Sequence, residues 1–445
     1  MTLESGPCCD FPHNGGIAPP RSWFVIEMIV MLPSQYLGSI ALLLGVAVIV
    51  GACAGRTIPS AEGSWRAIKC DSAVDAAANA SDEPGFSKAG WKTDFGKHCV
   101  PLSEITSGGP PRDGIPPLDH PQFVAPAQAD AWLRPQEPVI ALTRGGVARA
   151  YPLQILIWHE IVNDVIADLP VAVTFCPLCN LSLVFDRRAG GQELTFGTSG
   201  NLRFSDLVMW DRQTESWWQQ ATGEAIVGDL TGTHLMRVPS AVLSYEEFKR
   251  TYPEGGVLSR DGAAAETQAK TGSSRSYGAN PYVGYDRADS PPIQSFFADR
   301  TVDKRLPPKA RVAVATFATP PVAYVLDGLE HAIAVNDTIG KRPVVLLYLA
   351  GAASPLDTSA TAAGADVGQA VLYDPVVEGR TLTFVGGRAK TFTDRETGST
   401  WLVGGLAVAG PLAGKLLVPL DHEVTYWFIW SVFRPDSEVR RPSSQ

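Results

Sequence analysis

Hydrophobic positions along this chain fall in short runs separated by turn-forming residues, a pattern typical of β-strands. Two β-rich runs, residues 139–143 and 147–151, flank a glycine turn and predict a hairpin. Short apolar runs at residues 171–175 and 181–185 predict two further strands. Strands therefore dominate the expected fold.

Helical spacing of apolar residues occurs over shorter stretches. Within residues 152–165 apolar side chains recur at helical intervals, and Pro152 suits a first helical turn. Residues 245–252 predict a second short helix. The chain also contains 42 glycines and 35 prolines, which favour many strands joined by turns. We therefore expect a β-rich α+β fold with short helices.

Positions of the first half of the chain recur in the second half at a constant offset. Asn163 recurs as Asn336, 173 positions later (336 − 163 = 173), and Tyr151 recurs as Tyr324 (324 − 151 = 173). Further along the chain the offset drifts, as insertions in loops would make it do. This self-similarity indicates a duplicated domain of about 140 residues per copy. We expect two tandem repeats, each a curved-sheet or barrel-like unit.

The repeat and the composition divide the chain into six predicted segments. They are a leader with a lipoprotein-type signal or anchor (1–53), a tether (54–115), the first repeat (116–255), a linker (256–290), the second repeat (291–436) and a tail (437–445). The linker is rich in alanine, glycine, serine and threonine before its tyrosines begin.

Charge and composition exclude some classes of function. The formal net charge is −9 and the sequence pI is about 5.4, and no basic stripe is present to neutralise phosphates. We therefore expect no nucleic-acid partner. Seven histidines and five methionines are too few for a His- or Met-rich metal carrier.

The leader contains an uncharged apolar run, residues 37–52, that ends at Cys53. The last four residues, Val50-Gly51-Ala52-Cys53, resemble a bacterial lipobox, in which the cysteine is lipidated and becomes the first mature residue. An uncleaved N-terminal anchor is the alternative. Both alternatives place the body of the protein outside the cytoplasm and hold it at a membrane.

The remaining cysteines favour one structural pair. If Cys53 carries lipid, four thiols remain in an oxidising compartment, an even number that invites pairing. Cys70 and Cys99 flank a polar stretch with little core of its own. We predict a disulfide between them, which would contribute roughly 3–4 kcal/mol by restricting the unfolded chain.

The other two cysteines, Cys176 and Cys179, form a Cys-Pro-Leu-Cys motif between two predicted strands. Leu349 and Ala352 occupy the equivalent places in the second half. Residues kept in both halves are expected to support the fold, whereas residues present in one half are candidates for chemistry. Because a strand follows the motif, a thioredoxin-like fold, in which the CxxC opens a helix, does not fit.

His159 is the expected third member of this site, as a base or as a metal ligand, because Ala332 replaces it in the second half. Three readings stay open. The first is a redox-active Cys176–Cys179 pair, assisted by His159, that acts on an unknown thiol or peroxide substrate. The second is a zinc or copper site built from the same three residues. The third is a non-catalytic cell-envelope module with a structural disulfide. The sequence predicts no particular cofactor.

Second-tier candidates follow from the same comparison of the two halves. Ser199 and Asn201 are not reproduced in the second half, so they are candidates for the site. Asp164 recurs as Asp337, which favours a fold-supporting role and leaves a role in the site as the secondary possibility. The segment from Asp211 is also repeated, which favours a capped turn.

Five motifs occur in order along the chain. They are Ala150-Tyr151-Pro152-Leu153, His159-Glu160-Ile161-Val162-Asn163-Asp164, Phe175-Cys176-Pro177-Leu178-Cys179, Ser199-Gly200-Asn201-Leu202 and Asp211-Arg212-x-Thr214-x-Ser216. Together they resemble the bacterial domain-of-unknown-function 3179 family, from about Gly114 through the second repeat.

The resemblance implies export and redox chemistry. Members of the family often carry a secretion or lipoprotein signal, and some are described as selenoproteins with selenocysteine in the CxxC. A selenolate is a better nucleophile and leaving group than a thiolate, so the resemblance implies redox chemistry at Cys176 and Cys179. Asn180 stands where the family pattern has glycine, and asparagine tolerates the left-handed conformation that a turn requires there.

Overall fold

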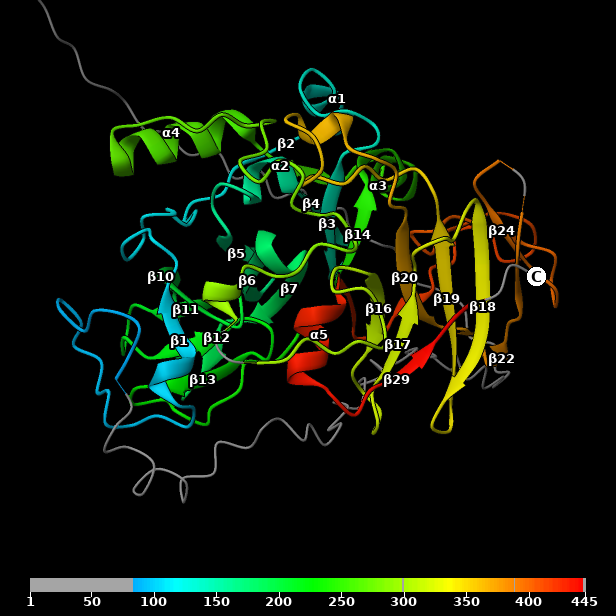
Figure 1. The fold of residues 1–445 in the computed structure, drawn as a ribbon. Helices are drawn as coiled ribbons and strands as arrows, with labels where there is room; N and C mark the ends of the chain where they lie inside the picture. The colour runs from blue at the N-terminus through cyan, green and yellow to red at the C-terminus, as the bar shows by residue number, and fades with distance from the viewer. Residues whose placement is uncertain (1–82, 298–299, 388, 443–445) are drawn as a thin grey trace, which may run out of the picture. The chain divides into compact units, whose positions relative to one another are not determined.

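The computed structural model describes residues 83–297, 300–387 and 389–442 (Figure 1). The predicted leader, the lipidation site Cys53 and Cys70 lie outside the described residues, so the Cys70–Cys99 disulfide stays a prediction. Among the residues that the structure describes, we find no helix with the length and apolar character needed to cross a membrane.

The described part of the first half contains three main sheets. The first has the order β14 (Ala241–Ser244), β3 (Pro138–Arg144), β4 (Val147–Pro152), β15 (Gly256–Leu258), β2 (Phe123–Val124). The second is β5 (Ile161–Ile166), β6 (Leu169–Cys176), β7 (Leu181–Asp186). The third is β1 (Ile105–Ser107), β10 (Phe196–Arg203), β11 (Asp206–Asp211), β12 (Trp217–Gln219), β13 (Glu224–Val227). A small hairpin joins β8 (Arg188–Ala189) to β9 (Gln192–Glu193).

The second half has sheets of similar order. One is β28 (His422–Tyr426), β16 (Arg311–Ala315), β17 (Val322–Val325), β29 (Glu438–Arg440). Another is β18 (Ala332–Ile339), β19 (Arg342–Leu349), β20 (Gln369–Asp374), β27 (Val418–Pro419). The third is β23 (Phe384–Gly386), β24 (Phe392–Asp394), β25 (Thr400–Trp401), β26 (Ala407–Ala409), with a hairpin of β21 (Val376–Val377) and β22 (Arg380–Thr381).

The helices are short. The α-helices are α1 (Pro126–Ala129), α2 (Leu153–Leu156), α3 (Tyr245–Thr251), α4 (Arg260–Thr271) and α5 (Trp427–Phe433). Single 3₁₀ turns are η1 (Leu102–Glu104), η2 (Pro177–Cys179), η3 (Gln294–Phe296) and η4 (Thr361–Ala363). The β-rich character with few helices is thus as expected. The described strands form several open sheets, so the barrel-like form considered for each unit is not observed in them.

The hairpin predicted from the two β-rich runs is confirmed. β3 and β4 pair in antiparallel register, with Leu142 opposite Arg149. Gly145 and Gly146 have positive φ angles of 56° and 81°, which glycine adopts without a steric penalty. The predicted strands on either side of the Cys-Pro-Leu-Cys motif are also confirmed, as β6 and β7.

The helix predicted over residues 152–165 is wrong for most of its length. Only Leu153–Leu156 is helical, and the chain reverses at Glu160, whose φ is 59°. Ile161–Ile166 is instead the strand β5, paired with β6. Most of β5 is buried, and an apolar run in a buried strand resembles a buried helix in its periodicity.

Part of the predicted linker is structured. Gly256–Leu258 forms β15, which runs parallel to β4 in the first sheet. Arg260–Thr271 forms α4, whose first turn is capped by Ser259: its hydroxyl accepts a hydrogen bond from the Gly262 N–H. The alanine-rich composition that suggested a linker here supports a helix instead.

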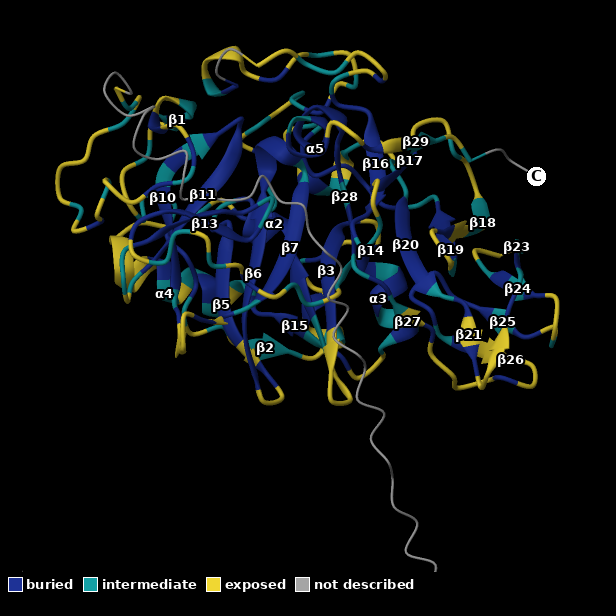
Figure 2. Ribbon diagram, turned by 90° about the horizontal axis from the view of Figure 1, so that it is seen from below, coloured by how far each residue is buried: buried dark blue, intermediate teal, exposed yellow. Residues whose placement is uncertain are grey.

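One hydrophobic core contains residues of both halves. Phe175, Phe185 and Leu181 of the first half belong to the same buried cluster as Tyr426 and Phe428 of the second. In Figure 1 the red helix α5 lies beside the green strands of the first half, and Figure 2 shows β6 and nearly all of β7 as buried. The region around the cysteines is therefore enclosed by both halves of the chain.

Candidate dithiol site

The two cysteines lie at the turn that joins β6 to β7. Cys176 is the last residue of β6, η2 follows as one 3₁₀ turn, and Asn180 closes it in the left-handed conformation with φ 48° and ψ 41°. This is the conformation expected for Asn180. The turn brings the Sγ atoms of Cys176 and Cys179 to 3.0 Å from each other. Both residues are buried, with 1% and 0% of their surface exposed.

A second turn, between β10 and β11, contacts the sulfur atoms. Its two central residues, Phe204 and Ser205, both have positive φ angles, 56° and 68°. The Ser205 carbonyl oxygen lies 3.6 Å from Cys176 Sγ and 3.3 Å from Cys179 Sγ. Non-glycine residues are uncommon in this conformation, and surrounding contacts must hold it. One such contact is the Ser205 N–H, which donates to the Phe296 carbonyl at 2.7 Å.

Asp206, the first residue of β11, places a carboxylate beside Cys179. Its Oδ1 lies 3.5 Å from Cys179 Sγ. Its Oδ2 accepts hydrogen bonds from Gln219 Nε2 at 2.5 Å and from the Ala221 N–H at 2.8 Å. Burial raises the pKa of Asp206 to about 7, although these hydrogen bonds lower it. Asp206 is thus suited to exchange a proton with Cys179 near neutral pH.

The hairpin that carries Asp206 is longer in the first half than in the second. Phe196 pairs with Asp211 across 15 positions (211 − 196), whereas Phe384 pairs with Asp394 across only 10 (394 − 384). The tip that reaches the sulfur atoms is therefore restricted to the half that carries the cysteines. Sequence reasoning missed Asp206, and the change of offset between the halves was the signal that marked this insertion.

Glu160 is a second acid that the sequence did not single out. It lies in the left-handed conformation at the start of β5 and is buried, with 7% of its surface exposed. Burial, and then the charge of Asp206, raise its pKa to about 8. At the offset of 173 its counterpart is Ile333. Strained non-glycine backbone of this kind persists where surrounding structure requires it and is frequent at functional sites.

The two thiols are unequal. Burial raises the pKa of Cys176, and the contact with Cys179 lowers it in part. The pKa of Cys179 is raised well above its usual value by burial, then by its contact with Cys176 and by the charge of Asp206. Burial therefore disfavours ionisation of both thiols, and only Cys179 has the Asp206 carboxylate beside it.

Aromatic and polar residues from later in the chain cover the cysteines. The Tyr285 hydroxyl donates to the Leu178 carbonyl at 3.0 Å. Thr425 of β28 donates its hydroxyl to the Cys179 carbonyl at 3.0 Å, across 246 positions of sequence. Burial raises the pKa of Tyr282, Tyr285 and Tyr426, and charges at the cysteines raise the pKa of each of them further. The second half therefore contributes directly to the environment of the pair.

The hydrogen bonds of the buried His159 join it to Pro116 and Tyr277. Its Nδ1 lies 2.6 Å from the Pro116 carbonyl, so Nδ1 carries the proton. Its Nε2 accepts from the Tyr277 hydroxyl at 2.6 Å. Burial lowers the pKa of His159 to about 4, so the ring is neutral at physiological pH. Both nitrogens have these partners, and the ring joins three segments of the fold. The expectation that His159 assists the thiols stays a prediction.

The second-tier candidates form hydrogen bonds and an ion pair within the sheets. The Ser199 hydroxyl donates to the Val208 carbonyl and accepts from the Asn201 N–H, which stabilises the bulge in β10. Asp164 accepts from the Tyr151 hydroxyl at 2.6 Å and pairs with an arginine, Arg149. These contacts lie within the sheets and do not involve the sulfur atoms.

The repeated Asn–Asp pair supports this assignment. Asp337 accepts from the Tyr324 hydroxyl at 2.8 Å, and it also pairs with an arginine, Arg440, at 2.6 Å. Asn336 forms two hydrogen bonds with the backbone of Phe384, at 2.8 and 2.7 Å. Asn163 forms two with Phe196, at 2.9 and 2.8 Å.

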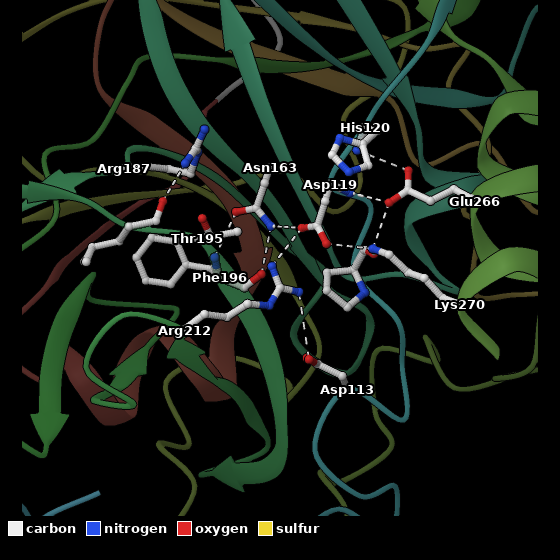
Figure 3. A network of polar contacts seen from close by, with 12 residues as sticks. Asp113, Asp119, His120, Asn163, Arg187, Thr195, Phe196, Arg212, Glu266 and Lys270 are labelled. Carbon is white, nitrogen blue, oxygen red and sulfur yellow. Dashed lines mark hydrogen bonds and ion pairs between the residues drawn. The ribbon is translucent and has the colours of Figure 1, made fainter. Parts of the chain in front are cut away.

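A polar network lies next to Asn163 (Figure 3). Asp119 accepts from Asn163 Nδ2 at 2.7 Å, from Arg212 at 2.9 Å and from Lys270 of α4 at 2.7 Å. Lys270 also pairs with Glu266 at 2.7 Å. These charges are matched to one another, and the network joins α4 to the sheets.

A metal ion could be held by the cysteine site, though with different ligands from those expected. The structure brings three potential ligand atoms within 4.8 Å of one another, one each from Cys176, Cys179 and Asp206. Asp206 thus takes the place that sequence reasoning gave to His159. Thiolates with a carboxylate suit Zn²⁺, whose Zn–S distance of about 2.3 Å would set the sulfur atoms about 3.8 Å apart in a tetrahedral site.

Comparison with known proteins supports the resemblance noted from the motifs. No curated protein and no solved structure matched the chain. A family model described as "Protein of unknown function (DUF3179)" matches residues 112–437, which include both halves and the cysteine site. The chain belongs to the DUF3179 family.

Proposed function

We propose that this protein is an oxidoreductase in which Cys176 and Cys179 cycle between dithiol and disulfide. The observation that carries the proposal is the pair of buried sulfur atoms 3.0 Å apart with a carboxylate 3.5 Å from one of them. A disulfide bond is about 2.05 Å long, so the two sulfur atoms need to approach each other by only about 1 Å for the bond to form.

The two cysteines have different roles in this reaction. Cys176 ionises first and attacks the electrophilic sulfur or oxygen of the substrate, whose weak bond breaks. Cys179 then passes its proton to Asp206 and attacks Cys176 Sγ. The substrate atom leaves, and the Cys176–Cys179 disulfide forms. The dithiol loses two electrons, and the substrate gains them.

We also propose that the chain is a duplicated unit whose second copy has lost the chemistry. The proposal is supported by the recurring hydrogen bonds of Asn163 and Asn336 and by the similar strand orders of the two halves. The second copy lacks both cysteines and the longer hairpin. Its remaining role in this proposal is to cover the first copy.

The reaction is tested by redox titration of the described site. We expect the pair to equilibrate with glutathione buffers within roughly −120 to −270 mV, the range of known dithiol oxidoreductases. Alkylation and peptide mapping report the fraction oxidised, and Cys176→Ser and Cys179→Ser serve as controls. A pair that resists reduction in the folded protein would contradict the redox function and favour a structural disulfide.

Metal binding is the second candidate, because Asp206 completes a three-ligand set with the cysteines. Native mass spectrometry of protein purified without chelator separates the two functions. A stoichiometric metal that oxidant and reductant leave in place would overturn the redox proposal and favour the metal site. Loss of such a metal in Asp206→Asn would identify the ligand.

For location, we propose export and lipid anchoring at Cys53, as the apolar run before it suggests. Cells that express Cys53→Ala should release the protein from the membrane fraction, with altered processing. Equal membrane retention of the variant and the parent would favour an uncleaved anchor.

A further inference from the structure

Three buried polar side chains share one face of the third sheet of the first half. Arg203 of β10 is the register partner of Asp206, and Gln219 of β12 is the register partner of Val208, two residues after Asp206. Register partners lie on the same face of a sheet, and so do residues two apart along a strand. The side chains of Arg203, Asp206 and Gln219 are therefore neighbours, and each residue exposes at most 4% of its surface.

The amide group of Gln219 has a defined orientation between the other two side chains. Its Oε1 accepts from Arg203 Nη1 at 3.4 Å, and its Nε2 donates to Asp206 Oδ2 at 2.5 Å. A guanidinium group has only donors, so the amide atom that faces Arg203 is the oxygen. The amide nitrogen then faces the carboxylate. Arg203 thus determines which end of the amide contacts Asp206.

Arg203 is itself held in place. Its Nε and Nη2 donate to the same carboxylate oxygen of Glu104, at 2.9 and 2.6 Å. Its Cζ lies 4.4 Å from the centre of the Phe204 ring, and Glu104 also pairs with Arg300. Hydrogen bonds between charged groups are stronger than neutral ones and fix the geometry of both partners. A continuous set of polar contacts therefore runs from Glu104 through Arg203 and the Gln219 amide to Asp206.

These residues are restricted to the half that carries the cysteines. The tryptophan before Gln219 is kept in the second half: Trp218 and Trp401 each donate through Nε1 to the aspartate of the repeated turn, at 2.9 and 2.8 Å. The residue after Trp401 is Leu402, so an apolar side chain replaces the glutamine there. The hairpin tip that carries Arg203 is also restricted to the first half. The same comparison singled out the two cysteines.

We propose that Arg203 and Gln219 are positioning residues for Asp206. Arg203 orients the Gln219 amide, and the amide nitrogen holds Oδ2 of Asp206, so that Oδ1 stays directed at Cys179. The inference rests on the proposed dithiol function and adds two residues that act on its second step. Oδ2 also accepts from the Ala221 N–H at 2.8 Å, whereas Oδ1 lies 3.5 Å from Cys179 Sγ. Oδ1 is therefore the oxygen that receives the thiol proton.

The second step balances with these roles. Cys176 already carries the substrate sulfur in a mixed disulfide. Cys179 passes its proton to Oδ1 of Asp206 and attacks Cys176 Sγ, so that the Sγ–Sγ bond forms and the bond to the substrate sulfur breaks. The departing thiolate takes the proton from Oδ1. One mixed disulfide and one thiol thus give one internal disulfide and one free thiol.

The test separates the two steps in single turnovers of the reduced full-length protein. The protein and its variants are mixed with bis(hydroxyethyl) disulfide and quenched in acid, and mass spectrometry distinguishes the mixed disulfide at Cys176 from the Cys176–Cys179 disulfide. We expect Gln219→Met to slow the second step about 10-fold, because a hydrogen bond to the carboxylate is lost, so the mixed disulfide accumulates. Arg203→Met should slow it by a smaller factor, since the amide remains but can rotate. The first step should change less than twofold in both variants.

Gln154→Met is the matched control. Gln154 is another buried glutamine that donates to a buried carboxylate, that of Glu137, at 2.9 Å. The other partners of Glu137 are Arg134 and Thr361, outside the cysteine site. We expect Gln154→Met to keep the second-step rate of the parent, although it also loses a buried hydrogen bond. Gln219→Leu, which introduces the residue of the second half, serves as a further variant if Gln219→Met does not fold.

The outcomes distinguish this inference from the function on which it rests. Equal second-step rates in the parent, the Gln219 variant and Arg203→Met would overturn the inference and leave the dithiol function standing. Slowing of equal size in Gln154→Met would show a general effect of lost stability and would also overturn the inference. A parent protein that forms neither the mixed nor the internal disulfide would overturn both.

Discussion

At the scale of single residues, the cysteine site is an acidic cluster whose pKa values burial raises to near neutral pH. Asp206 and Glu160 have pKa values raised to about 7 and about 8, and burial is the first cause for both. Near neutral pH these groups hold protons that they would lose in water. These two acids can therefore take up and release protons beside the cysteine pair near neutral pH.

Asp206→Asn is expected to stabilise the protein at high pH. The unfolded carboxyl ionises near pH 4 and the folded one near pH 7, so folding takes up a proton between these values and stability falls as pH rises. The penalty is absent below pH 4 and complete above about pH 7. We expect Asp206→Asn to raise the free energy of unfolding at pH 8 by on the order of 3 kcal/mol, with little change at pH 4.

Urea unfolding of the reduced protein at the two pH values measures this effect. The amide keeps an acceptor oxygen for Gln219 and Ala221, so loss of those hydrogen bonds should not obscure the result. Equal effects of Asp206→Asn at pH 4 and pH 8 would contradict the assignment of a raised pKa.

The hydroxyl of Tyr426 leads to a second prediction about stability. Its burial without a partner among the described residues costs free energy that Tyr426→Phe removes. We expect the free energy of unfolding of this variant to be about 1 kcal/mol higher than that of the parent. Tyr373→Phe removes a buried hydroxyl that donates to the Val403 carbonyl at 2.8 Å, so its free energy of unfolding should be lower than that of the parent. A loss of stability in Tyr426→Phe would mean that the hydroxyl has a partner in solution.

At the scale of elements, two turns position the site: η2 with Asn180, and the tip of the β10–β11 hairpin. Both depend on non-glycine residues in the left-handed conformation, Asn180, Phe204 and Ser205. Such turns keep their geometry because the flanking strands are paired and buried. The distances between sulfur and carboxylate therefore depend on the register of strands more than on the turn residues alone.

Substitutions of Asn180 test the turn that carries the cysteines. Asn180→Ala should lower the free energy of unfolding by about 1–2 kcal/mol, because an alanine Cβ is strained at a φ of 48°. Asn180→Gly should be close to neutral. Urea titration of the two variants and the parent gives the comparison, and equal values for alanine and glycine would show that the turn relaxes.

The sequence predicted these elements unevenly. The β3–β4 hairpin and the strands β6 and β7 followed from local patterns and are confirmed. The helix expected after Pro152 was wrong, because a strand buried on both faces is apolar at nearly every position. Such a strand lacks the alternation of apolar and polar residues that would have marked it as a strand. Comparison of the two halves singled out Cys176 and Cys179 as candidates. Asp206 was not identified, because it reaches them through the pairing of strands distant in sequence.

At the scale of the whole molecule, His159 connects segments that sequence places far apart. Its ring binds Pro116 before β5 and Tyr277 after α4, and Thr267 of α4 lies 3.5 Å from Nε2. The histidine motif therefore serves the assembly of the first half.

His159→Ala should consequently lower stability and spare the thiols. We expect the free energy of unfolding to fall by about 2–4 kcal/mol, because a cavity and unpaired buried groups remain. The rate of alkylation of Cys176 at neutral pH, measured under conditions where both proteins stay folded, should change less than twofold. A large drop in alkylation with unchanged stability would restore His159 to the chemistry.

The hydrogen bond from Thr425 to the Cys179 carbonyl constrains how the second half of this chain can evolve. Thr425 and Tyr426 are adjacent in β28, so their side chains point to opposite faces of the strand. An insertion or deletion that moved β28 by one position against β16 would exchange those faces and remove the Thr425 hydroxyl from the Cys179 carbonyl. The surroundings of Cys179 therefore depend on the register of a strand that lies 246 positions further along the chain.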